Sequence, residues 1–382
     1  MKPMISLQIL TATVLLAAPA LFAKQAADET SRAERPRIEV CFVLDTTGSM
    51  SGLIEGAKQK IWSIANEVIK ADPTPVVRFG LIGYRDRGDE YVTRVFDLTD
   101  DLDSIYGQLR GFSANGGGDG PESVSQALDE AVKKISWSQD RQVLKIVFLV
   151  GDAPPHTDYA DGPDYKVVCQ DAARKELIIN TIQCGNMVET TPIWQEIARL
   201  SEGKFASIGQ TGNMTVVSTP MDTELAQLNK DLGGTLIGYG SRRMRETVHA
   251  KQAAAEAAPV PAAADRLSYN LASGKAVQGE GELIDGLNSG ELKLESLKKD
   301  DLPEELQKMS KEELKAHIEK QQQKRAELQG RLKTLSEKRE AYIRDEMKKL
   351  ADSGKGDAFD EQVARTIRSQ AAKKGISYGP EK

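Results

Sequence analysis

Apolar residues follow two alternating periodicities through the first two thirds of the chain. Residues 38–44 form an apolar run that is interrupted only by Glu39, which is typical of a strand that is covered on both faces. In residues 53–68 the apolar positions recur at helical spacing. Residues 76–84 and 91–98 predict two strands that are joined by a short polar loop and therefore pair antiparallel.

The same alternation continues to about residue 240. A helix is predicted from about residue 122, and residues 143–150 give the most strongly apolar strand. Strand and helix patterns then alternate at residues 177–182, 193–200, 204–208 and 225–236. This order predicts an α/β unit over residues 36–240, with a Rossmann-like, doubly wound, mostly parallel six-stranded sheet and helices on both faces.

The composition changes after this unit. Residues 241–265 are rich in Ala and Pro, which predicts a linker without a packed core. Residues 266–382 are expected to form a mainly α-helical, coiled-coil-like region. A flawed heptad stripe runs through it, with positions alternately four and three apart at Leu314, Ile318, Gln321, Arg325, Leu328, Leu332, Leu335, Arg339 and Tyr342.

Two interpretations of this stripe stay open. The helix folds back on a neighbouring helix that carries Phe359, Val363 and Ile367, or it pairs with a helix of a partner. The three polar positions in the stripe, together with Gly330, favour the first, because they weaken a long two-chain coiled coil.

The N-terminal residues predict an export signal. Lys2 precedes an apolar run at residues 5–16, and small residues follow, as in a secretory signal peptide over residues 1–23. The alternative is an uncleaved membrane anchor, since residues 4–23 are nearly long enough to span a bilayer. We therefore expect a periplasmic or secreted protein with no other membrane association.

The net charge bears on the class of partner, and the cysteine content bears on disulfide formation. With 51 Lys and Arg against 57 Asp and Glu, the net charge is −6, and the mixed charges do not predict a nucleic-acid partner. Export makes a disulfide between Cys169 and Cys184 plausible, because these residues flank a predicted helix and strand whose ends would meet. The alternative is that these two and Cys41 are buried thiols.

Acidic and hydroxyl side chains follow the predicted strands. Asp45, Thr47 and Ser49 occupy alternate positions in the turn after the first strand, so that their oxygens can converge. Asp152 follows the strand at residues 143–150 and therefore lies at the same edge of a parallel sheet. These oxygens suit a hard cation such as Mg²⁺ better than they suit zinc.

A third loop carries two further acids. Residues 115–122 read Asn-Gly-Gly-Gly-Asp-Gly-Pro-Glu, which places Asp119 and Glu122 just before a helix. Glycine in this loop allows the backbone to approach an ion closely. Each loop alone has a simpler explanation, a turn with a helix N-cap. Three acid loops in one α/β unit favour a shared cation site.

On the basis of these three loops, the sequence resembles a von Willebrand factor type A domain over about residues 38–240. Asp45, Thr47 and Ser49 stand at the DxSxS positions of the metal-ion-dependent adhesion site of that family, with Thr in place of the first Ser. Asp152 matches the distal Asp that the family places near the ion, directly or through water.

The third loop departs from the common pattern of the family, in which this loop supplies a Thr. It is similar to the acidic loop of β-integrin I-like domains, which implies Glu122 as the fourth contributor, with Asp119 beside it. An additional carboxylate would neutralise Mg²⁺ more fully and make the ion a weaker acceptor of an acidic group from a partner.

The resemblance implies a bacterial secreted protein that recognises another protein. In this family the ion, Mg²⁺ with Mn²⁺ or Ca²⁺ as alternatives, keeps one coordination position for a Glu or Asp of the bound partner. The last helix of the family, here about residues 221–237, can shift when the ligand binds.

Three classes of function follow. The leading hypothesis is a divalent-cation-dependent protein-binding module of an exported protein, serving adhesion or assembly and without enzymatic activity. The second is a structural or assembly protein that acts through the helices at residues 303–373. The third is a Mg²⁺-dependent phosphatase, but Thr47 stands where that mechanism needs a second acid.

Two features receive no role at this point. Arg87-Gly88-Asp89 is an integrin-binding tripeptide on a loop expected at the same edge, and we attribute it to chance. His156 lies near Asp152, but no second histidine accompanies it, so no histidine-based metal site is predicted.

Overall fold

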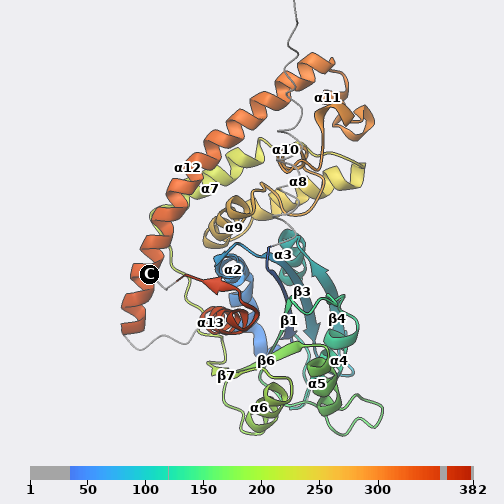
Figure 1. Ribbon diagram of the computed structural model, residues 1–382. Helices are drawn as coiled ribbons and strands as arrows, with labels where there is room; N and C mark the ends of the chain where they lie inside the picture. Colours follow the sequence, from blue (N-terminus) through green and yellow to red (C-terminus); the bar gives the residue numbers. More distant parts are fainter. Residues whose placement is uncertain (1–34, 119, 353–358, 380–382) are drawn as a thin grey trace, which may run out of the picture.

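The computed structural model describes residues 35–118, 120–352 and 359–379 (Figure 1). The expected signal peptide at residues 1–23 and the candidate ligand Asp119 lie outside the described residues. In the part of the chain that is described, none of the helices combines the length and the apolar character needed to cross a membrane.

A six-stranded sheet forms the centre of the α/β unit (Figure 1). Its order is β4-β3-β1-β5-β6-β7, and all neighbouring strands are parallel except β3 and β4. The strands are β1 (Arg37–Asp45), β3 (Val76–Tyr84), β4 (Thr93–Thr99), β5 (Leu144–Gly151), β6 (Leu177–Cys184) and β7 (Phe205–Ile208). The predicted fold class is confirmed.

Helices cover both faces of this sheet, because successive side chains of a strand point to opposite faces. On β1, Val40 and Phe42 enter one buried cluster, and Cys41 and Val43 enter the other. The helices on the first face include α2 (Ser51–Val68) and α3 (Leu102–Arg110). Those on the second are α4 (Val124–Lys133), α5 (Tyr165–Arg174) and α6 (Thr190–Leu200).

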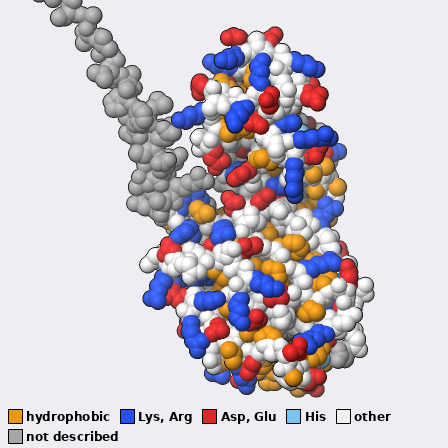
Figure 2. All heavy atoms as spheres, turned by 90° about the vertical axis from the view of Figure 1, so that its right-hand side faces the viewer, with side chains coloured by type: hydrophobic (Ala, Val, Ile, Leu, Met, Phe, Trp, Pro, Cys, Tyr) orange, Lys and Arg blue, Asp and Glu red, His pale blue; other side chains and the backbone are white. Residues whose placement is uncertain are grey.

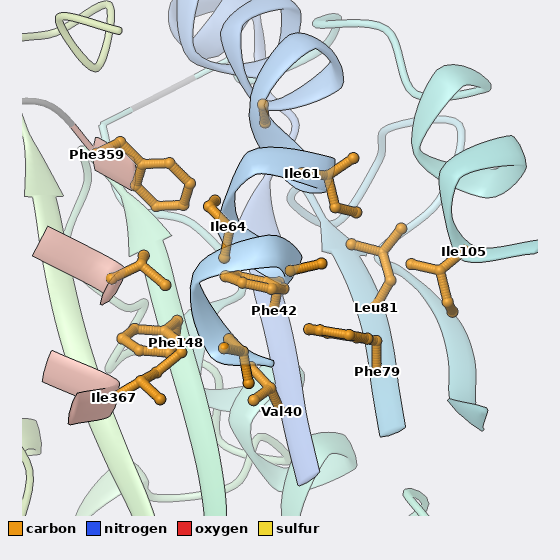
Figure 3. Packing of buried hydrophobic residues seen from close by; sticks show 14 of the residues in the cluster. Val40, Phe42, Ile61, Ile64, Phe79, Leu81, Ile105, Phe148, Phe359 and Ile367 are labelled. Carbon is orange, nitrogen blue, oxygen red and sulfur yellow. The ribbon is translucent and has the colours of Figure 1, made fainter. Parts of the chain in front are cut away.

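The last helix of the chain, α13 (Phe359–Ala371), completes the first face of the sheet. Figure 3 shows Phe359 and Ile367 beside Phe42 and Phe148, two sheet residues whose ring centroids lie 5.6 Å apart. Our expectation that Phe359, Val363 and Ile367 pack against the long preceding helix is therefore wrong. Helix α13 contacts α2 and β5 instead, because its apolar face matches the surface that α2 leaves uncovered.

Two short strands attach the C-terminal segment to the α/β unit a second time. Strand β8 (Ser377–Tyr378) pairs antiparallel with β2 (Ala71–Asp72), which follows α2. The hydroxyl of Tyr378 also donates a hydrogen bond to the carbonyl oxygen of Val68, at 2.9 Å. The strand pairing and this hydrogen bond thus join segments that are about 300 positions apart in the sequence.

The predicted linker at residues 241–265 is folded, so this expectation is corrected. It contains α8 (Arg242–Glu256) and the first part of α9 (Val260–Ser273), which bury several alanines. Alanine has the highest helix propensity of all residues. Pro259 precedes α9 and Pro261 lies in its first turn, where the missing backbone N–H has no helical partner to lose.

The long helix α12 (Lys311–Asp352) follows two short helices, α10 (Leu283–Asn288) and α11 (Glu304–Gln307). It packs on α7 (Asp222–Gly233) and α9. Leu328 and Leu332 of the heptad stripe are buried there in one cluster with leucines of α7 and α9. The apolar part of the stripe is therefore used inside the molecule.

Both arginines of the stripe are buried, Arg325 against α10 and Arg339 against α7. Arg325 forms ion pairs with Glu282 at 2.7 Å and with Asp285 at 2.8 Å. Arg339 pairs with Asp222 at 3.1 Å. Two of the three polar positions that interrupt the heptad pattern thus form buried intramolecular ion pairs.

The three cysteines are free and buried. Cys184 belongs to the cluster on the first face of the sheet, whereas Cys169 and Cys41 belong to the cluster on the second. The disulfide between Cys169 and Cys184 is therefore contradicted, because the sheet separates the two side chains. The alternative of three buried thiols holds.

Helices α8 and α9 lie at the amino ends of β1 and β5, above the sheet in Figure 1. Arg266 of α9 binds Asp103 of α3 through two hydrogen bonds of 2.6 and 2.8 Å, and Asn66 near the end of α2 donates to the carbonyl oxygen of Asp265. The carboxyl ends of β1 and β5 lie at the opposite edge of the sheet. On the face drawn in Figure 2, positive and negative side chains are interspersed and form no large patch of one sign.

Candidate metal centre

The first loop of the site begins at Asp45, the last residue of β1, which is completely buried. The Oδ1 atom of Asp45 accepts hydrogen bonds from the backbone N–H of Thr47 at 2.8 Å and from the Thr47 hydroxyl at 2.6 Å. The Thr47 hydroxyl lies 3.4 Å from the hydroxyl of Ser49. The alternating spacing of these residues therefore brings their oxygens together, as predicted from the sequence.

Backbone hydrogen bonds dock the third loop onto the first. The N–H of Asn115 donates to Thr46 O at 3.1 Å, and the N–H of Gly48 donates to Gly116 O at 3.2 Å. Gly117 has a φ of +78°, and a Cβ atom there would lie 3.1 Å from Thr47 Cβ and 3.1 Å from Glu122 Oε1. Only glycine suits this close approach at positive φ.

Glu122 reaches the same place from the end of the third loop. Its N–H donates to Pro154 O at 2.9 Å, and its carbonyl oxygen accepts from the N–H of His156 at 3.0 Å. These bonds tie the loop to the segment that follows β5. The side chain is buried, and the Oε2 atom has no hydrogen-bond partner within the described structure.

Asp152 follows β5 and is held from a fourth segment of the chain. Its Oδ2 atom accepts a 2.6 Å hydrogen bond from Nε2 of Gln210, which also donates to Ser49 O at 3.4 Å. The backbone comes very close here, because a Cβ atom at Gly151 would lie 2.9 Å from Asp45 Cβ. Asp45 and Asp152 are thereby neighbours at one edge of the sheet.

Burial dominates the electrostatics of the two innermost acids. It raises the pKa of Asp45 to about 7, against the lowering effect of the Thr47 hydrogen bonds, and the charge of Asp152 raises it further. Burial also raises the pKa of Glu122 to about 9, with additional repulsion from Asp45 and other carboxylates. Both acids would ionise readily only with a cation beside them.

The donor set fits a hard cation. Asp45 Oδ2 and Glu122 Oε2 are buried oxygens without a hydrogen-bond partner among the described residues, and the hydroxyls of Thr47 and Ser49 lie next to Asp45. Within the described ranges of the chain, no group of three or more His, Cys, Asp or Glu side chains is arranged so that it could hold a metal ion. Two carboxylates with two hydroxyls match Mg²⁺, which takes oxygen ligands and retains water, rather than zinc.

Of the predicted ligands, the structure brings Asp45, Thr47, Ser49, Glu122 and Asp152 to one edge of the sheet. Asp119 lies outside the described residues. Sequence reasoning did not find Gln210. It is an uncharged residue in the loop after β7, and nothing in its local sequence indicates that it holds Asp152.

The loop after β3, to which the sequence assigned no role, also supports the site. The Asp89 Oδ2 atom accepts from the N–H groups of Gly117 and Asp86, both at 3.1 Å, and therefore supports the third loop of the site. Arg87 pairs with Asp161 at 2.7 Å. The Arg-Gly-Asp tripeptide thus has a structural use inside the molecule.

Comparison with known proteins identifies the family of the α/β unit. Residues 39–216 match the model of the von Willebrand factor A domain family. Human von Willebrand factor A domain-containing protein 7 is 35% identical over 120 residues, which are 31% of this chain and 12% of that protein. A protein of Acanthamoeba polyphaga mimivirus, described as ariadne-like with a RING finger, is 22% identical over 55% of this chain and 22% of its own. The chain spans less than a quarter of the length of either relative.

Solved structures with similar regions include proximal thread matrix protein 1 from the mussel byssus. It is 17% identical, with a TM-score of 0.36 over 46% of this chain and 42% of its own. An aerotolerance-related membrane protein from Bacteroides fragilis is 15% identical, with a TM-score of 0.32 over 46% of this chain and 92% of its own.

Von Willebrand factor A domains generally mediate protein–protein interaction and adhesion, are typically not enzymes, and commonly bind a divalent metal ion. The family match begins in β1 and ends beyond β7, so it covers all six strands of the sheet. This chain therefore carries a von Willebrand factor A domain at residues 39–216.

Proposed function

We propose that this protein binds a partner protein through a divalent cation at the carboxyl ends of β1 and β5. The observation that carries the proposal is the pair of buried oxygens, Asp45 Oδ2 and Glu122 Oε2, that lack hydrogen-bond partners in the described part of the chain. Burying a carboxylate oxygen without a partner costs free energy. A cation shared by the two loops removes that cost.

Each residue has a definite role in the proposal. Asp45, Thr47 and Ser49 supply oxygens from the first loop, and Glu122 supplies one from the third. Asp152, oriented by Gln210, contributes directly or through a water molecule. The ion is Mg²⁺, with Mn²⁺ and Ca²⁺ as alternatives that accept the same ligands.

One coordination position of the ion is left for a Glu or Asp of the partner. Glu122 adds a carboxylate that many family members lack, so the ion attracts an acidic ligand less strongly. We therefore expect binding of moderate affinity that depends on the ion, rather than a permanent complex.

Ion binding is tested by titrating the full chain with Mn²⁺ in a calorimeter. Asp45→Asn keeps the size of the side chain but removes its charge, and we expect affinity to fall at least about 100-fold, or about 2.7 kcal/mol. Asp140→Asn is the matched control, because Asp140 precedes β5 at the opposite end of the sheet. Equal affinity of both variants would refute the metal site.

Partner binding is tested by affinity capture from the extracytoplasmic fraction of the source organism, with Mg²⁺ or with EDTA. Proteins that the wild type retains only with Mg²⁺, and that Asp45→Asn does not retain, are the expected partners. If the same proteins bind in EDTA, the interaction does not use the ion.

The two other hypotheses have less support. Assembly through α12 would need a free apolar stripe, but Leu328 and Leu332 are buried against α7 and α9. A phosphatase would need an acid at the position of Thr47, whose hydroxyl instead donates to Asp45.

We also propose that the protein is exported to the periplasm or the exterior of a bacterial cell. The support is the signal-peptide pattern of residues 1–23. Mass spectrometry of the full-length gene product tests this. A mature N-terminus shortly after residue 23 in the extracytoplasmic fraction is expected, and an intact chain in the cytoplasm would refute export.

A further inference from the structure

The hydroxyl of Tyr84 is a further buried polar atom at the carboxyl edge of the sheet that has no hydrogen-bond partner among the described residues. Tyr84 is the last residue of β3 and is fully buried. The parallel register pairs it with Asp45, the last residue of β1. Tyr84 belongs to the buried cluster on the second face of the sheet. Since paired residues of neighbouring parallel strands project from the same face, the side chains of Tyr84 and Asp45 both lie on that face.

Gly151 leaves room for the Tyr84 hydroxyl beside the Asp45 carboxylate. It follows Val150, the register partner of Leu44, and therefore lies next to Asp45 on the other neighbouring strand, β5. A Cβ atom at Gly151 would lie 2.4 Å from the Tyr84 hydroxyl oxygen and 3.0 Å from Asp45 Oδ2. Both oxygens thus border the same small space, which a side chain at residue 151 would fill.

The Tyr84 hydroxyl is a donor among acceptors. Burial raises the pKa of Tyr84 well above its usual range, and the charges of Asp45, Glu122 and Asp152 raise it further. The hydroxyl therefore keeps its proton and can donate a hydrogen bond. Asp152 already accepts a side-chain hydrogen bond, at 2.6 Å. The atoms nearest to a Cβ at Gly151 belong to Tyr84 and Asp45, so Asp45 is the acceptor that the geometry favours.

We propose that Tyr84 is a positioning residue of the metal centre, whose hydroxyl donates a hydrogen bond to the carboxylate of Asp45 when the ion is bound. The inference rests on the proposed function. Asp45 Oδ1 is already held by two hydrogen bonds from Thr47. A donor at Oδ2 holds the second oxygen and prevents rotation of the carboxylate. Because a carboxylate oxygen has two lone pairs, Oδ2 can accept from Tyr84 and still face the ion.

A carboxylate that is held at both oxygens favours a small ion. Mg²⁺ demands near-ideal octahedral geometry with oxygens at about 2.0–2.1 Å, whereas Ca²⁺ accepts irregular geometry at about 2.3–2.6 Å. A fixed Asp45 adapts poorly to the longer distances. The Tyr84 hydroxyl therefore strengthens the binding of Mg²⁺ more than that of Ca²⁺.

The test is Tyr84→Phe in the full chain, which removes the hydroxyl and keeps the ring. In calorimetric titrations we expect the affinity for Mg²⁺ to fall about tenfold, as for other hydrogen-bond partners of metal ligands, and the affinity for Ca²⁺ to fall less. In EDTA the melting temperature should stay the same or rise, because the variant removes a buried hydroxyl that has no partner without the ion.

Tyr378→Phe is the matched control. The Tyr378 hydroxyl donates to Val68 O at the far end of α2, so its loss should lower the melting temperature and leave the affinity for Mg²⁺ unchanged. The two variants are thus expected to have opposite effects on stability and on ion binding.

The results separate a positioning role of Tyr84 from a purely structural one. A lower melting temperature of Tyr84→Phe in EDTA, or equal losses of Mg²⁺ and Ca²⁺ affinity, would show a structural role and overturn the inference. Unchanged Mg²⁺ affinity would overturn it as well. A wild-type chain that binds neither ion contradicts the proposed function itself. If Tyr84→Phe does not fold, a crystal structure of the wild type with Mn²⁺ decides instead, and a distance above about 3.5 Å between the Tyr84 hydroxyl and the Asp45 carboxylate overturns the inference.

Discussion

Replacing Phe359 with alanine tests whether α13 is part of the core of the von Willebrand factor A domain, although it lies far outside the matched residues. The Phe359 side chain is 2% exposed, and its ring centroid lies 6.3 Å from that of Phe42. Figure 3 shows it above the sheet at the level of α2. Truncation removes a buried aromatic side chain and leaves a cavity, so we expect a loss of about 3–5 kcal/mol in the free energy of unfolding.

The assay is urea-induced unfolding followed by circular dichroism, with wild type and variant under identical conditions. Tyr342→Ala is the control, since Tyr342 is 37% exposed on α12 and also loses an aromatic ring. The control should change the free energy of unfolding by no more than about 0.5 kcal/mol.

The same variant links the core to the metal centre. The N–H of Phe359 donates to Gly212 O at 3.0 Å, and Gly212 lies two residues from Gln210, which holds Asp152. We therefore expect Mn²⁺ affinity to fall as well in Phe359→Ala. A destabilisation below about 1 kcal/mol would refute the reasoning, because it would mean that α13 does not complete the sheet face.

Three further predictions address the site and the helical region. Burial raises the pKa of Asp45 to about 7 and that of Glu122 to about 9, so the folded metal-free protein retains protons that the unfolded chain releases, and its stability falls as the pH rises from about 4 to about 9. Mg²⁺ should therefore raise the melting temperature more at about pH 8 than at about pH 5, and equal shifts would contradict this. Arg325→Met leaves the buried carboxylates of its ion pairs uncompensated and should cost about 3–5 kcal/mol in urea unfolding, whereas Arg331→Met, at an exposed pair, should cost less than about 1 kcal/mol. Gly117→Ala introduces a Cβ at positive φ between two proposed ligands and should weaken Mn²⁺ binding about tenfold, which is about 1.4 kcal/mol, and an unchanged affinity in calorimetry would count against the site.

The strands and the acid loops were predictable because their signals are local. Val40, Cys41, Phe42 and Val43 form an unbroken apolar run, and such a run is typical of a strand buried on both faces. Asp45 follows this run after Leu44, and parallel strands place their carboxyl ends at one edge of the sheet. The convergence of the candidate ligands was therefore predictable from short sequence motifs and the order of the elements.

The helical region was predicted less well because its signals depend on context. An Ala- and Pro-rich segment is compatible both with a linker and with helices whose prolines occupy first turns, and packing against the neighbouring helices α2, α7 and α12 makes the helical form stable. Arg325 and Arg339 interrupt the heptad pattern in the sequence. Local sequence does not indicate that they form buried ion pairs with Glu282 and Asp222, which are distant in the chain.

By itself, the sequence determined the alternation of strands and helices, the mostly parallel sheet and the edge at which Asp45, Glu122 and Asp152 collect, since each of these follows from periodicity and from residues close together in the chain. Only the tertiary structure decided that α13 returns to cover Phe42 and that Gln210 orients Asp152. The physical reason is that these contacts join surfaces far apart in the chain. Their stability comes from matching shape and burial, which no local pattern of residues records.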